Sequence, residues 1–398
     1  MKKFNLLQNP FFIAGILLIF IVIVTAQSIN LPPRISETGL KFTHYNNYLI
    51  FKQSYFHLIQ NKDLYQLYPV EHWDYYKYSP TFSLLMAPFV YLPDAAGLFL
   101  WNTLNVLVLF FALWKLPSLT DKNRLLLLGF ILIELITSIQ NSQSNALIAG
   151  LIIFAFLSLE KKQVALAALF IVLTVFIKLF GLVAFALFMF YPNKPKAILY
   201  TIAWTLLLAI LPLCVVPFSQ LQFLYQSWLH LLQNDHSASI GFSVAGWLQT
   251  WFGVESKNGV VFVGAIIFCL PFLKYKFFKE LKFKLFFLAS VLLWIVIFNH
   301  KAESPTFVIA VSGIAIWFFA QKMKIENLIL LSLAFLFTVL SPTDIFPKFL
   351  RDNYVTPYVL KAVPCIIIWC KIIFDLLFYK SESDLTETIS QESVSVVN

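Results

Sequence analysis

Long apolar runs recur along the whole chain, separated by short polar and charged clusters. The chain has 398 residues, of which 60% are hydrophobic and only 12% are charged, and its mean hydropathy is +0.79. Runs of about 20 apolar residues are typical of membrane-spanning helices. We therefore predict an all-α polytopic membrane protein with about twelve transmembrane helices. The predicted spans lie near residues 11–28, 96–115, 124–139, 146–159, 163–177, 180–192, 197–216, 258–273, 285–298, 305–320, 326–340 and 357–378.

Several of these runs, such as 146–159 and 180–192, are shorter than the roughly 20 residues that a helix needs to cross hydrocarbon. A helix can end at membrane depth only where it lines a protein-walled or water-filled cavity. The short runs therefore predict a site that is recessed into one leaflet.

Lysine and arginine predict the orientation, because cytoplasmic loops carry an excess of both. Starting with Lys2 and Lys3 inside, cations collect on alternate connections, as in the cluster at 274–284. This pattern predicts both termini in the cytoplasm and a site that faces outward. We expect the membrane to be a bacterial-type inner (cytoplasmic) membrane. The orientation requires residues 79–93 to form a half-depth or surface helix rather than a full span. The outer connections are then 29–95, 140–145, 217–257, 299–304 and 341–356.

The domain organisation is simple. We expect one integral-membrane domain over residues 1–380, with a large first outer loop at 29–95. The segment 381–398 is rich in Ser and Glu and poor in apolar residues, which predicts a disordered cytoplasmic tail. The apolar stretch from Phe11 to Thr25 ends without a small-x-small cleavage site, so an uncleaved first helix is expected.

Several classes of protein are disfavoured. The four cysteines, all within apolar segments and without CxxC spacing, argue against a disulfide framework or a zinc site. There is no GxxxxGK[ST], HExxH or GxSxG motif, which argues against an ATP-driven pump and a metalloprotease. No basic stretch or module for nucleic-acid binding is present either.

The first outer loop holds much of the polar chemistry. It contains four residues that we consider as catalytic acids or bases: His44, Asp63, Glu71 and Asp74. Residues 45–60 show helical spacing of apolar side chains, which fits a helix in the interface plane. An amphipathic lid without catalytic residues is the alternative reading of this loop.

Other polar groups gather in the remaining outer connections. Gln143 and Asn145 offer donors and acceptors of the kind that a sugar needs, although they also fit a helix cap. Lys178 ends an apolar helix, where it can snorkel to the headgroups or neutralise a lipid-linked phosphate. Glu134 lies at bilayer depth and is either functional or hydrogen-bonded within the bundle. The predicted substrate-binding and phosphate-binding residues are Tyr48, Lys77, Tyr78, Gln143, Asn145, Lys178, Asp235, His236, His300, Lys301 and Glu303.

A family resemblance is carried mainly by the end of the first loop and the helix after it. The segments Leu64-Tyr65, Tyr78-Ser79-Pro80, Leu92-Pro93 and Leu100-Trp101-Asn102, preceded by Tyr48, resemble the pattern of glycosyltransferase family 87. The turn at 143–145 and the run at 178–180 also look like motifs of this family. The resemblance covers roughly residues 10–375.

The resemblance implies a GT-C-type membrane transferase, similar to mycobacterial phosphatidylinositol-mannoside mannosyltransferases. Such an enzyme takes a hexose, often mannose, from a polyprenyl phosphate and passes it to a lipid or glycan acceptor at the outer face. The family's presumed base is an Asp four residues before the Tyr that matches Tyr48, and His44 occupies that position here. A histidine can act as a base near neutral pH, and Asp63, Glu71 and Asp74 are alternatives.

The expected mechanism is an inverting transfer in which Lys178 and the turn at His300-Lys301 hold the phosphate. The lipid-linked sugar is a co-substrate, and no cofactor, metal or nucleic-acid partner is expected. Two other functions stay open. A transporter or flippase of a lipid-linked saccharide would share the cationic cavity, although no internal repeat is evident. An inactive member of a glycosylation complex would explain the missing Asp.

Overall fold

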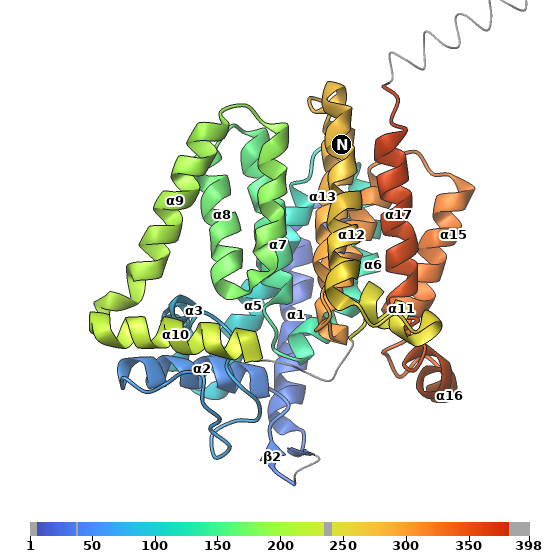
Figure 1. The fold of residues 1–398 in the computed structure, drawn as a ribbon. Coiled ribbons are helices and arrows are strands. Elements are labelled where there is room, and N and C mark those ends of the chain that lie inside the picture. The colour runs from blue at the N-terminus through green and yellow to red at the C-terminus, as the bar shows by residue number, and fades with distance from the viewer. Residues whose placement is uncertain (1–5, 37–38, 235–240, 382–398) are drawn as a thin grey trace, which may run out of the picture.

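The computed structural model describes residues 6–36, 39–234 and 241–381. Helices stand side by side in a bundle, and shorter elements form a cap across one end of it (Figure 1). Helix α1 runs down to this cap, and α17 runs back up from it (Figure 1). The expected tail at 381–398 lies outside the described residues, apart from Ser381.

The bundle consists almost wholly of apolar helices. After the short turn η1 (Leu6–Gln8), its first half contains α1 (Pro10–Asn30), α5 (Asp94–Trp114), α6 (Asp121–Gln140), α7 (Asn145–Glu160), α8 (Val164–Ile177), η2 (Leu179–Phe190), α9 (Lys194–Ile210) and η3 (Leu211–Cys214). Its second half contains α12 (Lys257–Cys269), η4 (Leu270–Phe277), α13 (Leu281–Ile297), η5 (Ser304–Thr306), α14 (Phe307–Phe319), α15 (Ile325–Leu333), η6 (Ala334–Leu340) and α17 (Val363–Leu377).

The cap is built from the polar connections. It contains β1 (Arg34–Ile35), β2 (Lys41–Phe42), α2 (Asn46–Ile59), α3 (Pro80–Leu85), α4 (Ala87–Val90), α10 (Phe218–Asn234), α11 (Val244–Phe252), α16 (Lys348–Leu350) and η7 (Arg351–Val355). The two strands pair antiparallel, with Arg34 opposite Phe42. Helices α2 and α10 lie across the end of the bundle (Figure 1).

The helical architecture confirms the predicted fold class in its coarse form. Within the described residues, five helices are long and apolar enough to cross a membrane: Pro10–Asn30, Asp94–Trp114, Asp121–Gln140, Lys194–Cys214 and Lys257–Phe277. Each of the twelve predicted ranges overlaps a helical segment, and the number that cross the membrane stays a prediction. The segment 79–93 forms two short helices, α3 and α4, which are too short for a span.

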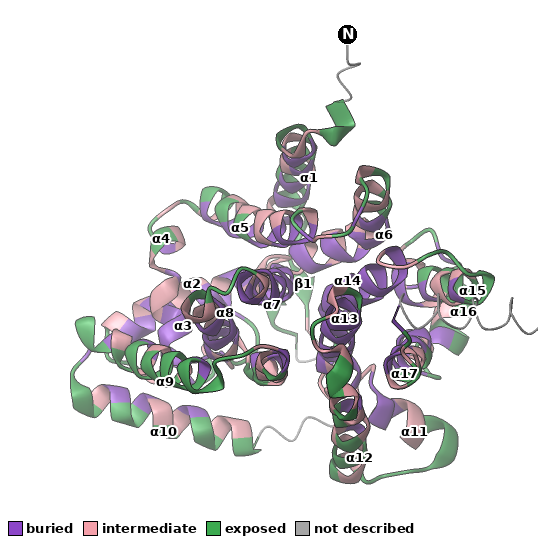
Figure 2. Ribbon diagram, turned by 90° about the horizontal axis from the view of Figure 1, so that it is seen from above, coloured by how far each residue is buried: buried purple, intermediate pink, exposed green. Residues whose placement is uncertain are grey.

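Burial separates an inner group of helices from an outer one. Helices α7, α13 and α14 are buried along almost their whole length, whereas α9 and α12 are largely exposed (Figure 2). The exposed faces are nevertheless apolar, with Ile198 and Phe262 each more than 60% exposed. Apolar side chains on the outside of a bundle suit contact with lipid tails rather than water.

A buried ion pair joins α6 to the segment before α17. Lys361 donates to Oε1 of Glu134 at 2.6 Å and to Oγ of Ser304 at 2.8 Å. The Lys361 side chain is 2% exposed and that of Glu134 is fully buried. The Lys361 ammonium also lies 4.9 Å from the ring centroid of Phe307. The structure therefore places Glu134 in a hydrogen-bonded ion pair, and Lys361 is a partner that sequence reasoning did not single out.

We expect Lys361→Ala to destabilise the protein by about 3–5 kcal/mol, because it leaves the Glu134 carboxylate buried and uncompensated. The measurement is the free energy of unfolding in mixed detergent micelles. Adding Glu134→Gln should recover much of the loss. As a control, Lys324→Ala breaks an exposed pair with Glu326 and should cost less than about 1 kcal/mol. Wild-type stability in Lys361→Ala would contradict a structural role for this pair.

Candidate functional site

A cavity of about 500 Å³ lies where the cap meets the bundle. We call it the first cavity. It collects side chains from the first loop, the α6–α7 turn, the α8–η2 junction, α10 and the turn before α14. Its lining consists of Arg34, Phe42, Thr43, His44, Asn46, Asn47, Ile50, Trp73, Asp74, Tyr75, Lys77, Tyr78, Asn141, Gln143, Lys178, Leu179, Phe180, Trp228, Leu232, Asn299, His300, Lys301, Glu303 and Thr306.

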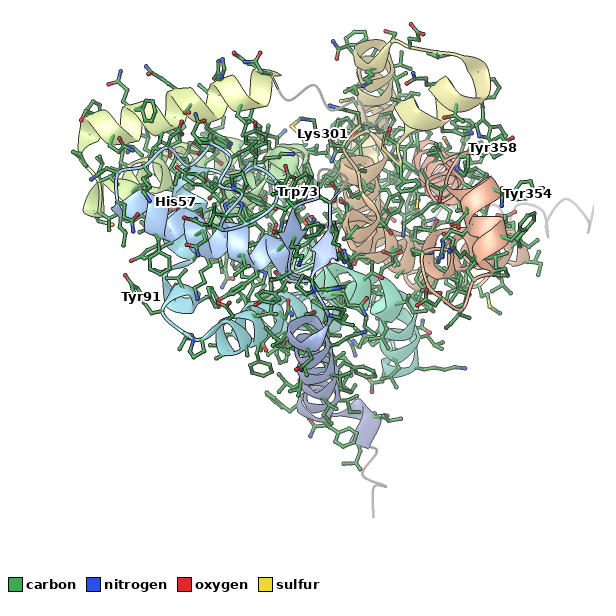
Figure 3. The ribbon with its side chains drawn as sticks, turned by 90° about the horizontal axis from the view of Figure 1, so that it is seen from below. His57, Trp73, Tyr91, Lys301, Tyr354 and Tyr358 are labelled. Atoms are coloured by element: carbon green, nitrogen blue, oxygen red, sulfur yellow. The ribbon has the colours of Figure 1, made fainter. Side chains whose placement is uncertain are left out.

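The start of α2 and the end of the first loop form one wall. Asn46 donates from Nδ2 to the carbonyl of Trp73 at 2.6 Å, and its Oδ1 accepts the Trp73 N–H at 2.8 Å. Asn47 donates to the carbonyl of Asn141 at 2.8 Å, which ties the same wall to the α6–α7 turn. Figure 3 shows Trp73 and Lys301 near the middle of this end of the molecule, well apart from His57. The two asparagines therefore hold the loop over the bundle.

His44 lies in this wall with one ring nitrogen already engaged. Its Nε2 lies 3.1 Å from the carbonyl oxygen of Pro32. A carbonyl only accepts, so Nε2 carries the hydrogen and Nδ1 of the neutral ring keeps its lone pair. That tautomer leaves Nδ1 able to accept a proton.

Asp74 lines the same cavity in an unusual backbone conformation. Its φ of 79° is in the left-handed region, which is uncommon for residues other than Gly. One carboxylate oxygen accepts the N–H of Tyr75 at 2.7 Å and lies 3.5 Å from Nζ of Lys77. Such strained positions gather at functional sites.

Lys178 stands at the vertex between α8 and η2. Its backbone is extended, with φ −143° and ψ 140°, so the chain reverses there. Gly181 makes the tight vertex possible, because a Cβ at that position would lie 1.9 Å from Oγ1 of Thr174. The Lys178 ammonium donates to Oε1 of Gln143 at 3.0 Å and to Oδ1 of Asn145 at 3.1 Å. These two amides aim the lysine at the cavity, and no carboxylate of the described residues is within ion-pair distance of its ammonium.

The turn from Asn299 to Thr306 forms the opposite wall. It contributes His300, Lys301 and Glu303 to the lining. The segment at Gly241 supports it from behind: Gly241 has a φ of +57°, and a Cβ there would lie 2.5 Å from the carbonyl oxygen of His300. A larger residue at Gly241 would therefore push this turn out of place.

The cavity brings together most of the predicted site residues. Nine of them line it: His44, Asp74, Lys77, Tyr78, Gln143, Lys178, His300, Lys301 and Glu303. Asn145 touches it through Lys178. The predicted residues Asp235 and His236 lie outside the described residues.

Three other predicted residues lie away from this cavity. Asp63 accepts the N–H of Tyr65 at 3.1 Å and the hydroxyl of Ser227 at 3.0 Å, so it ties the first loop to α10. Tyr48 is fully buried and donates to the carbonyl of Phe89 at 3.1 Å. Glu71 lies 2.8 Å from Nε2 of His57. Their roles in substrate binding or catalysis stay predictions.

Sequence reasoning missed several lining residues. Arg34 adds a cation, and Asn46, Asn47, Asn141 and Asn299 add amides. Asn46 and Asn47 follow His44 so closely that the first-loop candidates could have pointed to them. Asn141 and Asn299 fall within the predicted polar connections 140–145 and 299–304, whereas no local pattern marks Arg34.

The electrostatic balance of the lining is positive. Among the described lining residues, the four cations Arg34, Lys77, Lys178 and Lys301 outnumber the two carboxylates, Asp74 and Glu303. Cations and amide donors in a partly closed cavity can hold a phosphate or another anion. Within the described residues, no group of three or more His, Cys, Asp or Glu side chains could hold a metal ion.

The structure is that of a helical membrane protein with a cationic, amide-lined cavity at the end of its bundle. Residues 76–342 match glycosyltransferase family 87. This is about two thirds of the sequence, so the chain belongs to that family and is a membrane glycosyltransferase. No curated protein matches the chain.

The matched segment begins within the first loop. It includes Lys77, Lys178 and the turn at 299–306, but it excludes His44, Asp74 and the whole of α17. The family match therefore covers three of the four lining cations, Lys77, Lys178 and Lys301, but not Arg34. The correspondence between His44 and the family's Asp stays a prediction.

Burial lowers the pKa of two histidines of the first loop that lie outside the cavity, His57 and His72. It lowers the pKa of His57, even though the Glu71 carboxylate acts to raise it. It also lowers the pKa of His72. The unfolded loop takes up a proton near the ordinary histidine pKa of about 6.5, whereas the folded loop resists protonation. Acid below that pH therefore favours the unfolded loop.

We expect the first loop to loosen between about pH 7.5 and about pH 5.5, across the ordinary histidine pKa. The measurement is the rate of limited proteolysis within residues 60–75 in detergent. His57→Gln should weaken this pH dependence, because the substitute does not titrate. His230→Gln is the matched control, since His230 is exposed on α10. An unchanged pH dependence in His57→Gln would rule out this imidazole as its source.

Proposed function

We propose that this family 87 enzyme transfers a hexose, with mannose as the first candidate, from a polyprenyl phosphate to a lipid or glycan acceptor. One observation carries the proposal: a single cavity joins two candidate bases with four cations at the end of an apolar bundle. The recessed position suits a donor whose chain lies in lipid and whose headgroup enters the cavity. The site faces the outer side of a cytoplasmic-type membrane in this proposal.

The cations take the phosphate of the donor. Lys178 is fixed by Gln143 and Asn145, so it is oriented before substrate arrives. Lys77 and Lys301 come from opposite walls and can approach the same phosphate. As the sugar–phosphate bond breaks, its electron pair leaves with the phosphate oxygen, and fixed positive charge stabilises that developing charge.

The base acts on the acceptor. The acceptor hydroxyl gives its proton to the base while its oxygen attacks the anomeric carbon of the donor. We assign this role to His44, because Nδ1 keeps a lone pair and the resemblance places His44 at the family's acidic position. Asp74 is the other candidate in the cavity, with its carboxylate held by Tyr75 and Lys77. No metal is required where three lysines provide the positive charge.

We expect Lys178→Met to lower the transfer rate by about 10²–10³-fold, because one fixed charge at the leaving phosphate is lost. The assay follows a radiolabelled polyprenyl-phosphate hexose in membranes. Lys196→Met is the matched control, since Lys196 is exposed at the start of α9 and does not line the cavity. Full activity in both Lys178→Met and Lys301→Met would contradict the assigned phosphate site.

We expect His44→Gln to lower kcat by about 10²–10⁴-fold, the usual contribution of a general base. His44→Asp should retain more activity, because a carboxylate then occupies the same position. Asp74→Asn tests the other candidate in the same assay. A large loss in Asp74→Asn with near-normal activity in His44→Gln would move the base to Asp74. Normal turnover in both variants would remove the base from this cavity.

A further inference from the structure

A second cavity, of about 580 Å³, lies directly behind the turn that walls the first. The two cavities share Asn141. Consecutive residues of the turn face opposite ways: Glu303 and Thr306 line the first cavity, whereas Ser304 and Pro305 line the second. The second cavity is therefore separated from the first by one stretch of chain. Its size lies within the roughly 300–1,000 Å³ of small-molecule sites.

The lining of the second cavity differs chemically from that of the first. Its polar side chains are mainly hydroxyls and amides, including Thr137, Gln140, Asn141, Ser304, Thr343 and Thr356. Thr137 donates its own hydroxyl proton to the carbonyl of Ile133, and Thr343 donates its proton to that of Leu340. Both oxygens therefore keep lone pairs that can accept hydrogen bonds from a ligand.

The cations of the second cavity are compensated. Lys361 is paired with Glu134 at 2.6 Å. Arg351 lies 3.3 Å from Oδ1 of Asp352 and donates to the carbonyl of Thr343 at 3.2 Å. Asp344 adds a carboxylate to the lining. An anion therefore gains little here, in contrast to the first cavity.

We propose that the second cavity binds the saccharide of the acceptor. The lining offers many neutral hydrogen-bond donors and acceptors, which match the hydroxyl groups of a sugar. Its apolar residues Ile133, Pro305 and Pro342 match the apolar faces of the sugar ring. The contact at Asn141 brings this saccharide beside the phosphate site. The proposal rests on the transferase function proposed above. It assigns the donor to the first cavity and the saccharide of the acceptor to the second.

The segment 351–358 offers matched positions for a test. Thr356 lines the second cavity, whereas Asn353, three residues away and also exposed, does not. Figure 3 shows Tyr354 and Tyr358 of the same segment at the outer edge, well apart from Trp73 and Lys301. A bulky side chain at Thr356 can therefore obstruct the second cavity without entering the first.

The experiment uses purified full-length protein and an octyl mannoside with a diazirine next to its glycosidic oxygen. We expect photolabelling of peptides within 133–141 or 341–356, competed by octyl mannoside but not by octyl phosphate. Thr356→Trp should reduce labelling about tenfold or more, which is about 1.4 kcal/mol in binding free energy. Asn353→Trp should label like the wild type. Thr137→Val, which keeps the volume but removes the hydroxyl, should reduce labelling without filling the cavity.

Labelling that octyl phosphate displaces, or that survives Thr356→Trp unchanged in properly folded protein, would overturn the saccharide site. The transfer assay separates this outcome from failure of the proposed function. If labelling behaves as expected but no hexose is transferred, the transferase mechanism fails and the saccharide site stands. If transfer occurs and Thr356→Trp leaves the KM for the acceptor unchanged, the assignment of this cavity fails.

Discussion

The side chain of Asn145 holds three distant parts of the chain together at the end of the bundle. Its Oδ1 accepts from Lys178, and its Nδ2 donates to Gln143 and to the carbonyl of Pro305. The residue is fully buried, so water cannot replace these bonds and each lost partner would leave a polar atom unsatisfied. This one amide therefore fixes the positions of Lys178, the α6–α7 turn and the turn before α14.

One backbone segment, the turn at 299–306, lines both cavities with different kinds of side chain. The turn at 299–306 presents His300, Lys301 and Glu303 to the first cavity and Ser304 to the second. Its second face is held by Lys361, which donates to Ser304 while neutralising Glu134. Among the described residues, cations outnumber carboxylates in the lining of the first cavity, whereas the cations of the second cavity are paired. In our proposal, these two environments suit an anionic headgroup and a neutral saccharide.

The sequence was sufficient to predict features that depend on neighbouring residues, such as the apolar helices. Apolar runs predicted a helical membrane protein. Gln143 and Asn145 were singled out as donors and acceptors for a sugar and Lys178 as a cation for a phosphate, and Gln143 and Lys178 line the first cavity. The same reasoning noticed Glu134 but not Lys361, although that lysine falls inside a predicted span and is the countercharge that a buried carboxylate needs. Asp63 and Glu71 looked equivalent to Asp74 in the sequence. Only their partners, Ser227 on α10 and His57 on α2, separate them.

The sequence by itself determined the helical class, the family and the kinds of side chain available for the chemistry, because hydrophobic runs and local motifs act over short distances. The tertiary structure alone decided which of those side chains meet. His44, Lys178 and Lys301 are more than 100 residues apart in sequence, and their convergence depends on how the cap packs on the bundle. The tertiary structure also places a second, charge-compensated cavity next to the first. Its charge compensation depends on long-range ion pairs such as Glu134 with Lys361, which form only after the helices have assembled.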